Sequence, residues 1–167
     1  MAQIGDARKL LEYKLGTALG LERKVHTMLG TMEGKASLGQ LQEGFSRHRE
    51  ETQQQIRNLE QALDAIGGPD TAHKDAVMDG IAQHAEQMLG RVDDSLVDSI
   101  LAGGAAHTEH HEIATYEGLI TLAEALGEDD VVTLLEENLE QEQRTLKEIE
   151  TVQERLVQDA ARQPSAS

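Results

Sequence analysis

The 167-residue sequence predicts an all-α protein: a four-helix bundle with one long crossover that carries a short extra helix. Three observations predict this fold. Apolar residues recur at steps of three and four along four long segments, which is the period of one helical face. Only two prolines occur, and neither interrupts a periodic segment. The sequence also lacks the sustained alternation of apolar and polar residues that is typical of strands.

The first two long helices are expected to form a hairpin. The first should run from about Asp6 to about Met32. The second should begin near Ser37, a candidate N-cap, and end at the Gly-Gly-Pro turn of residues 67–69. A shorter helix is then expected over residues 71–89, before Gly in the next position ends it.

The last two long helices are expected to form a second hairpin. One should cover residues 94–126 and the other residues 128–161, with Gly127 as the C-cap between them. Acidic residues open the last helix, where they suit the positive end of the helix dipole. We expect a single domain over residues 1–162 and a disordered tail at residues 163–167.

The connector between the hairpins is roughly 25 residues long, which is enough to cross the length of a bundle. A single long crossover is the connectivity of ferritin-like bundles, whereas cytokine-type bundles need two. The order of the elements therefore predicts a ferritin-like four-helix bundle.

Composition excludes several classes of function. A formal charge of −16 argues against a nucleic-acid partner, because such a surface must neutralise phosphates with Lys and Arg. The absence of Cys excludes disulfides and zinc–thiolate sites. No apolar run approaches the ~20 residues that a membrane span needs. The start of the sequence also lacks the apolar segment of a secretory signal. We expect a cytoplasmic protein with no nucleic-acid and no membrane partner.

Acidic residues interrupt or flank the apolar stripe near the middle of every long helix. They are accompanied by one histidine, and the candidate metal-binding residues are Glu22 in the first helix, His48 and Glu51 in the second, Glu109 and Glu112 in the third, and Glu142 in the fourth. Burying an unpaired carboxylate costs several kcal/mol. Carboxylates at this position in all four helices are therefore hard to explain without a cation.

The positions along the helices also agree. Glu112 lies 15 residues before Gly127 and Glu142 lies 15 residues after it, so an antiparallel hairpin brings the two face to face. Around the first hairpin, Glu22 and Glu51 are out of register by about one turn, or ~5 Å. No Lys or Arg falls on the four stripes near the acids. An error of one residue in the assumed helix faces would turn some acids outward and leave a plain acidic bundle.

Five short motifs carry a resemblance to a known family. They are Leu21-Glu22-Arg23-Lys24, the segment from His48 to Glu60, Ala76-Val77-Met78-Asp79-Gly80-Ile81, Glu109-His110-His111-Glu112 with Tyr116 and the Leu122–Gly127 segment, and Glu140-Gln141-Glu142-Gln143. Over about residues 10–152 the chain resembles the YciF/YciE family of bacterial ferritin-like proteins, a stress-associated group of poorly defined activity. The resemblance implies a homodimer. Similarity to rubrerythrins implies that the five glutamates named above are metal ligands.

One feature departs from the usual di-iron pattern. Di-iron bundles carry Glu-x-x-His on two helices. Here the residue three after Glu51 is Gln54, and the residue three after Glu142 is Thr145. His48, one turn before Glu51, is therefore the candidate nitrogen ligand.

Other polar residues near the acids have two interpretations each. His107, His110 and His111 are either an accessory metal patch or surface and supporting residues, and we favour the latter. Tyr116 either donates a hydrogen bond to a ligand or acts as a redox neighbour, or it is simply a core tyrosine with a satisfied hydroxyl, and we favour the core tyrosine.

Hard carboxylate oxygens select hard cations, so the sequence predicts two metal ions per chain, with iron first and manganese as the alternative. Oxygen or peroxide would be the oxidant of bound ferrous iron, in a stress-protective role. The second hypothesis is a metal-stabilised structural or interaction module without turnover.

Overall fold

The computed structural model describes residues 4–162, and within that range it is helical with no strand. The elements are α1 (Ala7–Lys35), α2 (Gly39–Ala65), α3 (Ala76–Leu89), the short 3-10 helix η1 (Asp94–Leu96), α4 (Val97–Leu126) and α5 (Asp129–Arg162). The predicted all-α bundle with a short extra helix in the crossover is confirmed. The predicted tail, residues 163–167, lies outside the described residues.

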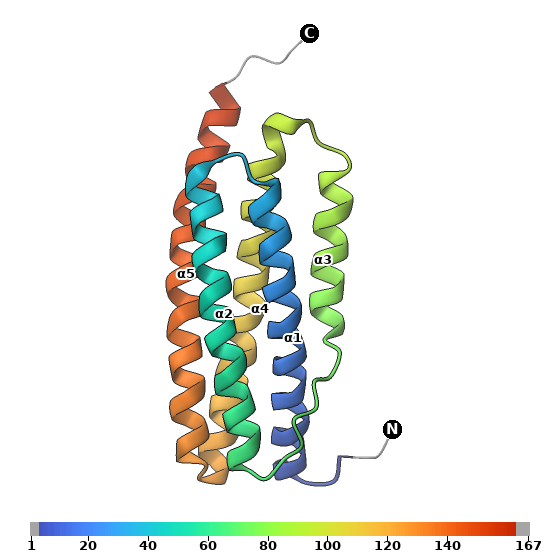
Figure 1. The fold of residues 1–167 in the computed structure, drawn as a ribbon, viewed down its shortest axis with the longest axis vertical. Helices are drawn as coiled ribbons and strands as arrows, with labels where there is room; N and C mark the ends of the chain where they lie inside the picture. Colours follow the sequence, from blue (N-terminus) through green and yellow to red (C-terminus); the bar gives the residue numbers. More distant parts are fainter. Residues whose placement is uncertain (1–3, 163–167) are drawn as a thin grey trace.

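Four long helices lie side by side and form the bundle (Figure 1). α1 and α2 form one antiparallel hairpin and α4 and α5 form the other, while α1 packs on α4 and α2 packs on α5. The connector after α2 turns back along the bundle, and α3 lies outside it against α4. The chain therefore returns to the opposite end before α4 begins, as the single-crossover prediction requires.

The core is divided into two apolar clusters. The first includes Leu11, Leu15, Leu59, Leu119 and Leu135. The second includes Leu29, Phe45, Leu101, Ile149 and Val152. Buried polar residues of all four long helices separate the two clusters, at the level that the interrupted stripes predicted. Apolar burial on both sides thus stabilises the bundle independently of the polar layer.

The connector crosses α1 at two glycines. His73 donates its backbone N–H to the carbonyl oxygen of Gly16 at 2.8 Å. A Cβ atom on Gly20 would lie 1.8 Å from the carbonyl oxygen of His73, so only glycine permits this approach. The ring of Tyr13 stacks on the His73 ring with centroids 4.7 Å apart. Contacts between connector and helix backbone therefore fix the path of the crossover.

The predicted start of the connector helix at residue 71 is wrong. α3 begins at Ala76, because the preceding residues run along α1, where the N–H of His73 bonds to Gly16 and not within a helix of its own. Asp75 is the N-cap, and its carboxylate accepts the N–H of Met78 at 2.8 Å.

The predicted N-cap of the second helix is also wrong. α2 begins at Gly39, with Leu38 in the cap position and no capping side chain of its own. The buried carboxylate of Asp98, from the first turn of α4, accepts the backbone N–H groups of Ser37 and Leu38, each at 2.9 Å. It also accepts the hydroxyl of Ser37 at 2.6 Å. A residue of the other hairpin thus satisfies donors that precede α2.

Two other helix ends agree with the sequence. Asp6 caps α1 by accepting the N–H of Lys9 at 2.8 Å. Gly127 ends α4 in the left-handed conformation, with φ of 71°.

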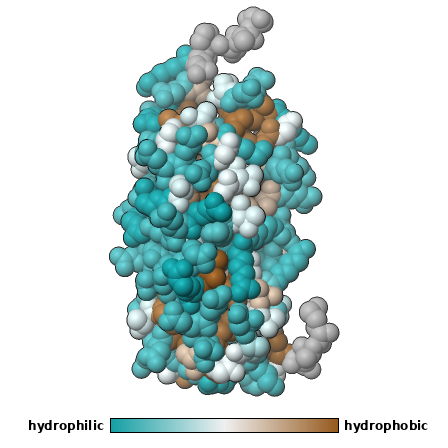
Figure 2. All heavy atoms as spheres, viewed as in Figure 1, coloured by the Kyte–Doolittle hydropathy of each residue, from teal (hydrophilic) through white to brown (hydrophobic). Residues whose placement is uncertain are grey.

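The face of the molecule shown in Figure 2 is largely hydrophilic, in keeping with the acidic composition. Between residues 4 and 162, none of the helices combines the length and the apolar character that crossing a membrane would take.

Candidate metal centre

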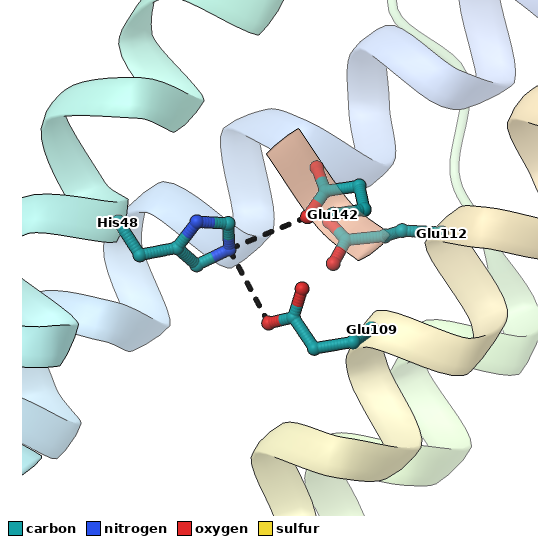
Figure 3. A group of neighbouring side chains, drawn as sticks. All are labelled: His48, Glu109, Glu112 and Glu142. Atoms are coloured by element: carbon teal, nitrogen blue, oxygen red, sulfur yellow. Dashed lines mark ion pairs between the residues drawn. The ribbon is translucent and has the colours of Figure 1, made fainter. Parts of the chain in front are cut away.

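Four side chains converge in the polar layer at the middle of the bundle. His48 comes from α2, Glu109 and Glu112 come from α4, and Glu142 comes from α5 (Figure 3). Each is buried, and one ligand atom from each lies within 4.8 Å of those of the others. Each residue sits on the inward face of its helix, at the point where the apolar stripe is interrupted.

His48 joins the two hairpins across this layer. Its Nε2 atom lies 3.3 Å from a carboxylate oxygen of Glu109 and 3.6 Å from one of Glu142. Its Nδ1 atom lies 3.4 Å from the hydroxyl of Thr145 and 3.5 Å from Glu51. Thr145 stands three residues after Glu142, where di-iron bundles usually carry histidine, so α2 supplies the imidazole instead.

Several buried oxygens in the cluster have no hydrogen-bond partner among the described residues. Both carboxylate oxygens of Glu112 and of Glu142 are in this state, as is one oxygen of Glu109. Buried carboxylate oxygens normally accept hydrogen bonds, because desolvation without a partner is costly. Converging oxygens without donors, next to one imidazole, are a donor set that fits a hard cation such as iron or manganese.

The electrostatics of the cluster point the same way. Burial raises the pKa of both Glu112 and Glu142 well above the usual range, and neighbouring carboxylates raise each further, although His48 lowers that of Glu142. Burial alone would lower the pKa of His48, but Glu109, Glu51 and Glu142 outweigh it and hold that pKa well above its ordinary value. Protonation therefore offsets the repulsion among these buried carboxylates.

Glu22, from α1, lies beside this group but is not one of its four members. One of its carboxylate oxygens accepts the hydroxyl of Tyr116 at 2.5 Å, and the other has no partner among the described residues. Burial raises the pKa of Glu22 to about 7, against the opposing effect of the Tyr116 hydrogen bond. The charge of Glu22 also raises the pKa of Glu112, so the two carboxylates share one environment.

A chain of buried amides supports Tyr116. Asn138 donates to the Tyr116 hydroxyl at 3.1 Å and accepts from Asn58 at 2.8 Å. Neither asparagine was predicted from the sequence, because the inward faces were assigned from apolar residues and acids. Asn138 is fully buried, whereas Leu139 is only partly buried. The available signal was spacing, since Asn138 lies four residues before Glu142.

Glu51 is placed differently from the other predicted residues. Its side chain is 21% exposed, and it accepts a hydrogen bond from Arg144 at 2.6 Å. The hydrogen bond to His48 and the Arg144 guanidinium hold the pKa of Glu51 below its usual value. No Lys or Arg was expected on the inward stripes near the acids, and Arg144, which is exposed, reaches Glu51 from outside the stripe. The role of Glu51 as a ligand stays a prediction.

The remaining histidines of α4 lie outside the cluster. His107 and His110 are exposed. His111 is half-buried, and its Nε2 atom lies 3.0 Å from the carboxylate of Asp75. Asp75 thus caps α3 and binds α4, so His111 helps to attach the crossover helix to the bundle.

Comparison with known proteins places the chain in a family. The sequence profile of the family described as "Domain of unknown function (DUF892)" matches residues 6–162. The chain belongs to the DUF892 family. The protein YciF of Escherichia coli K12 is 31% identical to it over 133 residues, which are 78% of this chain and 80% of YciF. The predicted resemblance to YciF-type proteins is confirmed.

Solved structures share the fold of this DUF892 chain. The E. coli protein YciF, described as a stress protein, aligns with a TM-score of 0.87 and 26% identity over 93% of this chain and 99% of YciF. YcfI of Rhodopseudomonas palustris, provisionally described as a structural protein, aligns with a TM-score of 0.87 and 31% identity, over 89% of this chain and 96% of its own. A protein of Xanthomonas campestris pv. campestris aligns with a TM-score of 0.75 and 27% identity, over 91% and 94%.

Proposed function

We propose that this DUF892 protein binds two metal ions in the middle of its bundle, iron by preference and manganese as the alternative. One observation carries the proposal. Four buried side chains, three of them carboxylates, place ligand atoms within 4.8 Å of one another, and most of the carboxylate oxygens have no donor among residues 4–162. A cation satisfies such oxygens without the protons that they otherwise hold.

The proposed ligands divide between two positions. Glu109, Glu142 and His48 face one another and would hold one ion, since His48 lies within 3.6 Å of both glutamates. Glu112 shares its environment with Glu22 and with Glu142, so this second group would hold the other ion. Glu51 would join only by exchanging its ion pair with Arg144 for a metal ion.

The proposed activity is the oxidation of bound ferrous iron by oxygen or peroxide, which would protect the cell under stress. The description of the relative YciF as a stress protein supports this role. A pair of bound iron ions would supply two electrons to the oxidant. The chain itself would fix the ligands, because the apolar clusters on both sides hold the four helices and exclude bulk water.

Metal content tests the binding step. Anaerobic reconstitution with ferrous iron, followed by elemental analysis, should give two equivalents per chain, and Glu142→Ala should lose bound metal while its far-ultraviolet circular dichroism is unchanged. Glu140→Ala is the matched control, because Glu140 is an exposed glutamate of the same helix. Full metal content in Glu142→Ala would remove that residue from the ligand set, and substoichiometric metal in the wild type would contradict a dinuclear centre.

The second candidate is a metal-stabilised structural module without turnover. The missing Glu-x-x-His pairs favour it, and so does the description of the relative YcfI. Rapid mixing of the ferrous protein with oxygen or hydrogen peroxide separates the two candidates. Growth of the near-ultraviolet absorbance of ferric iron, faster than for ferrous iron in buffer alone, supports turnover. Its absence at full metal occupancy supports the structural module.

A further inference from the structure

A pocket of about 590 Å³ opens between α2 and α5. Its side walls are mainly apolar and include Leu41, Phe45, Ile149 and Val152. Pockets of this size with apolar walls and a few polar groups are typical of sites for small organic molecules. The pocket lies beside the second apolar cluster, to which all four of these wall residues belong.

The same pocket reaches the candidate metal centre. His48 and Glu109, whose side chains lie 3.3 Å apart, are among its lining residues, and so is Thr145. All three are buried, so they form the inner end of the pocket and not its rim. A molecule in the pocket would therefore approach the centre from the side of His48 and Glu109.

The rim carries balanced charge. Arg47 and Lys147 line it together with Glu43 and Glu148, and Arg47 forms an ion pair with Glu148. No net positive charge is left to attract an anion, and the whole chain carries a formal charge of −16. Apolar walls and a neutral rim favour an uncharged molecule over a carboxylate or a phosphate.

We infer that this pocket admits a neutral organic hydroperoxide to the candidate metal centre, as the oxidant in the function proposed above. The inference rests on that function, which needs an oxidant with an O–O bond. Oxygen and hydrogen peroxide are too small to need such a pocket, whereas the organic hydroperoxides combine an O–O bond with an apolar body. The O–O bond breaks, two ferrous ions each give one electron, and two protons come from solvent. The products are the alcohol, water and two ferric ions.

Binding can be tested without metal, using cumyl alcohol as an unreactive, neutral analogue of cumene hydroperoxide. Nuclear magnetic resonance titration of the metal-free protein should show saturable shifts at residues 41–48 and 145–152. Gly44→Leu should abolish them. Gly44 lines the pocket, and a Cβ atom there would meet no other atom within 4 Å, so the new side chain should enter the pocket without displacing the helix. Gly118→Leu is the matched control, because Gly118 is exposed on α4 and its Cβ would also meet open space.

Oxidation rates test the role of the bound molecule. In the ferrous protein, Gly44→Leu should slow oxidation by cumene hydroperoxide at least about tenfold, as expected when a pocket no longer accepts its ligand. Oxidation by hydrogen peroxide should be unchanged, and Gly118→Leu should behave as the wild type with both oxidants.

The outcomes separate this inference from the proposed function. If the protein binds no iron but cumyl alcohol still shifts the pocket residues, the function fails, and with it the oxidant role. If iron binds and hydrogen peroxide oxidises it, but cumyl alcohol causes no saturable shift, the inference alone is overturned. Equal slowing with both peroxides in Gly44→Leu would also overturn it, because the pocket would then not select an organic molecule.

Discussion

Glu112 is fully buried, and neither of its carboxylate oxygens has a hydrogen-bond partner among the described residues. Burial and the charge of Glu142 hold its pKa well above the usual range. The amide of Glu112→Gln needs no proton to be neutral, so we expect this variant to stabilise the metal-free protein at pH 7 by about 1–4 kcal/mol. For a chain of this size each kcal/mol raises the melting temperature by roughly 2–4 °C.

The same variant should lose the stabilisation that ferrous iron or manganese gives the wild type. Melting curves with and without metal measure both effects, and Glu140→Gln, at an exposed position of α5, serves as the control. A metal-free Glu112→Gln protein that melts several degrees below the wild type would show that Glu112 supports a polar network. Glu112 would then be a structural residue and not a metal ligand.

Asp98, from the hairpin of α4 and α5, is predicted to stabilise the fold by its hydrogen bonds to the hairpin of α1 and α2. Its carboxylate accepts three hydrogen bonds from Ser37 and Leu38, at the start of α2. Asp98→Ala should lower the free energy of unfolding by about 1–2 kcal/mol, as for the loss of a helix cap. Urea denaturation measures this, with the exposed Asp94→Ala as control. Equal effects of the two substitutions would mean that the capping contacts contribute nothing.

At the scale of the elements, the path of the crossover depends on the glycines of α1. Alanine normally stabilises a helix interior by about 1 kcal/mol relative to glycine. At Gly20, however, a Cβ atom would lie 1.8 Å from the carbonyl oxygen of His73. The clash should outweigh the gain in helix propensity, so Gly20→Ala should lower the free energy of unfolding. Amide exchange at residues 70–75 should become faster, because the connector loses its contact with α1.

Gly118→Ala provides the opposite expectation. Gly118 lies in α4 with open space around a Cβ atom, so alanine should stabilise the protein by up to about 1 kcal/mol. Thermal melting compares the two variants directly. Stabilisation of both would mean that the connector does not need its close contact with α1.

The sequence analysis predicted the helices and most of their inward faces, because periodicity and glycine punctuation are local signals. Spacing about Gly127 put Glu112 opposite Glu142, and these two converge in the structure with His48 and Glu109, which were also among the six candidate ligands. Metal binding by these residues, and by Glu22 and Glu51, stays a prediction.

The errors share a physical cause. Asp98 binds Ser37, 61 residues away, and Arg144 reaches Glu51 across 93 residues. Neither contact has a signal in local spacing. The late start of α3 is similar, since the N–H of His73 bonds to α1 and not within its own segment. Features that depend on two distant segments could not be predicted from one of them.

At the scale of the whole molecule, stability should depend on pH in a direction set by the polar layer. Burial raises the pKa of Glu22 to about 7, and it also raises the pKa values of Glu112 and Glu142 well above their usual range. A raised carboxyl pKa stabilises the fold fully below the unfolded-state value, ~4.3 for glutamate, and this contribution is lost as pH rises through the folded value. The pKa of His48 is also raised, so its contribution to stability is likewise lost as pH rises above ~6.5.

The metal-free protein should therefore lose stability from about pH 4.5 to above pH 7, with the steepest loss near neutrality. Urea denaturation in the presence of a chelator measures the profile. Saturating metal should reverse the slope, because a cation replaces the protons. The double variant Glu112→Gln with Glu142→Gln should flatten the metal-free profile. A metal-free wild type that becomes more stable as pH rises from 5 to 7 would contradict the raised pKa values.

The polar layer takes His48 from the first hairpin and its three clustered glutamates from the second. Cutting the chain in the connector would leave each fragment with an incomplete set of ligands and a long apolar face. Two such fragments, made separately, would associate by burying those faces. A cation bound between them would raise the apparent affinity of that association by mass action. Under the proposed metal binding, the two hairpins are halves that one cation would join, and split versions of the protein would report the concentration of that cation by reassembling.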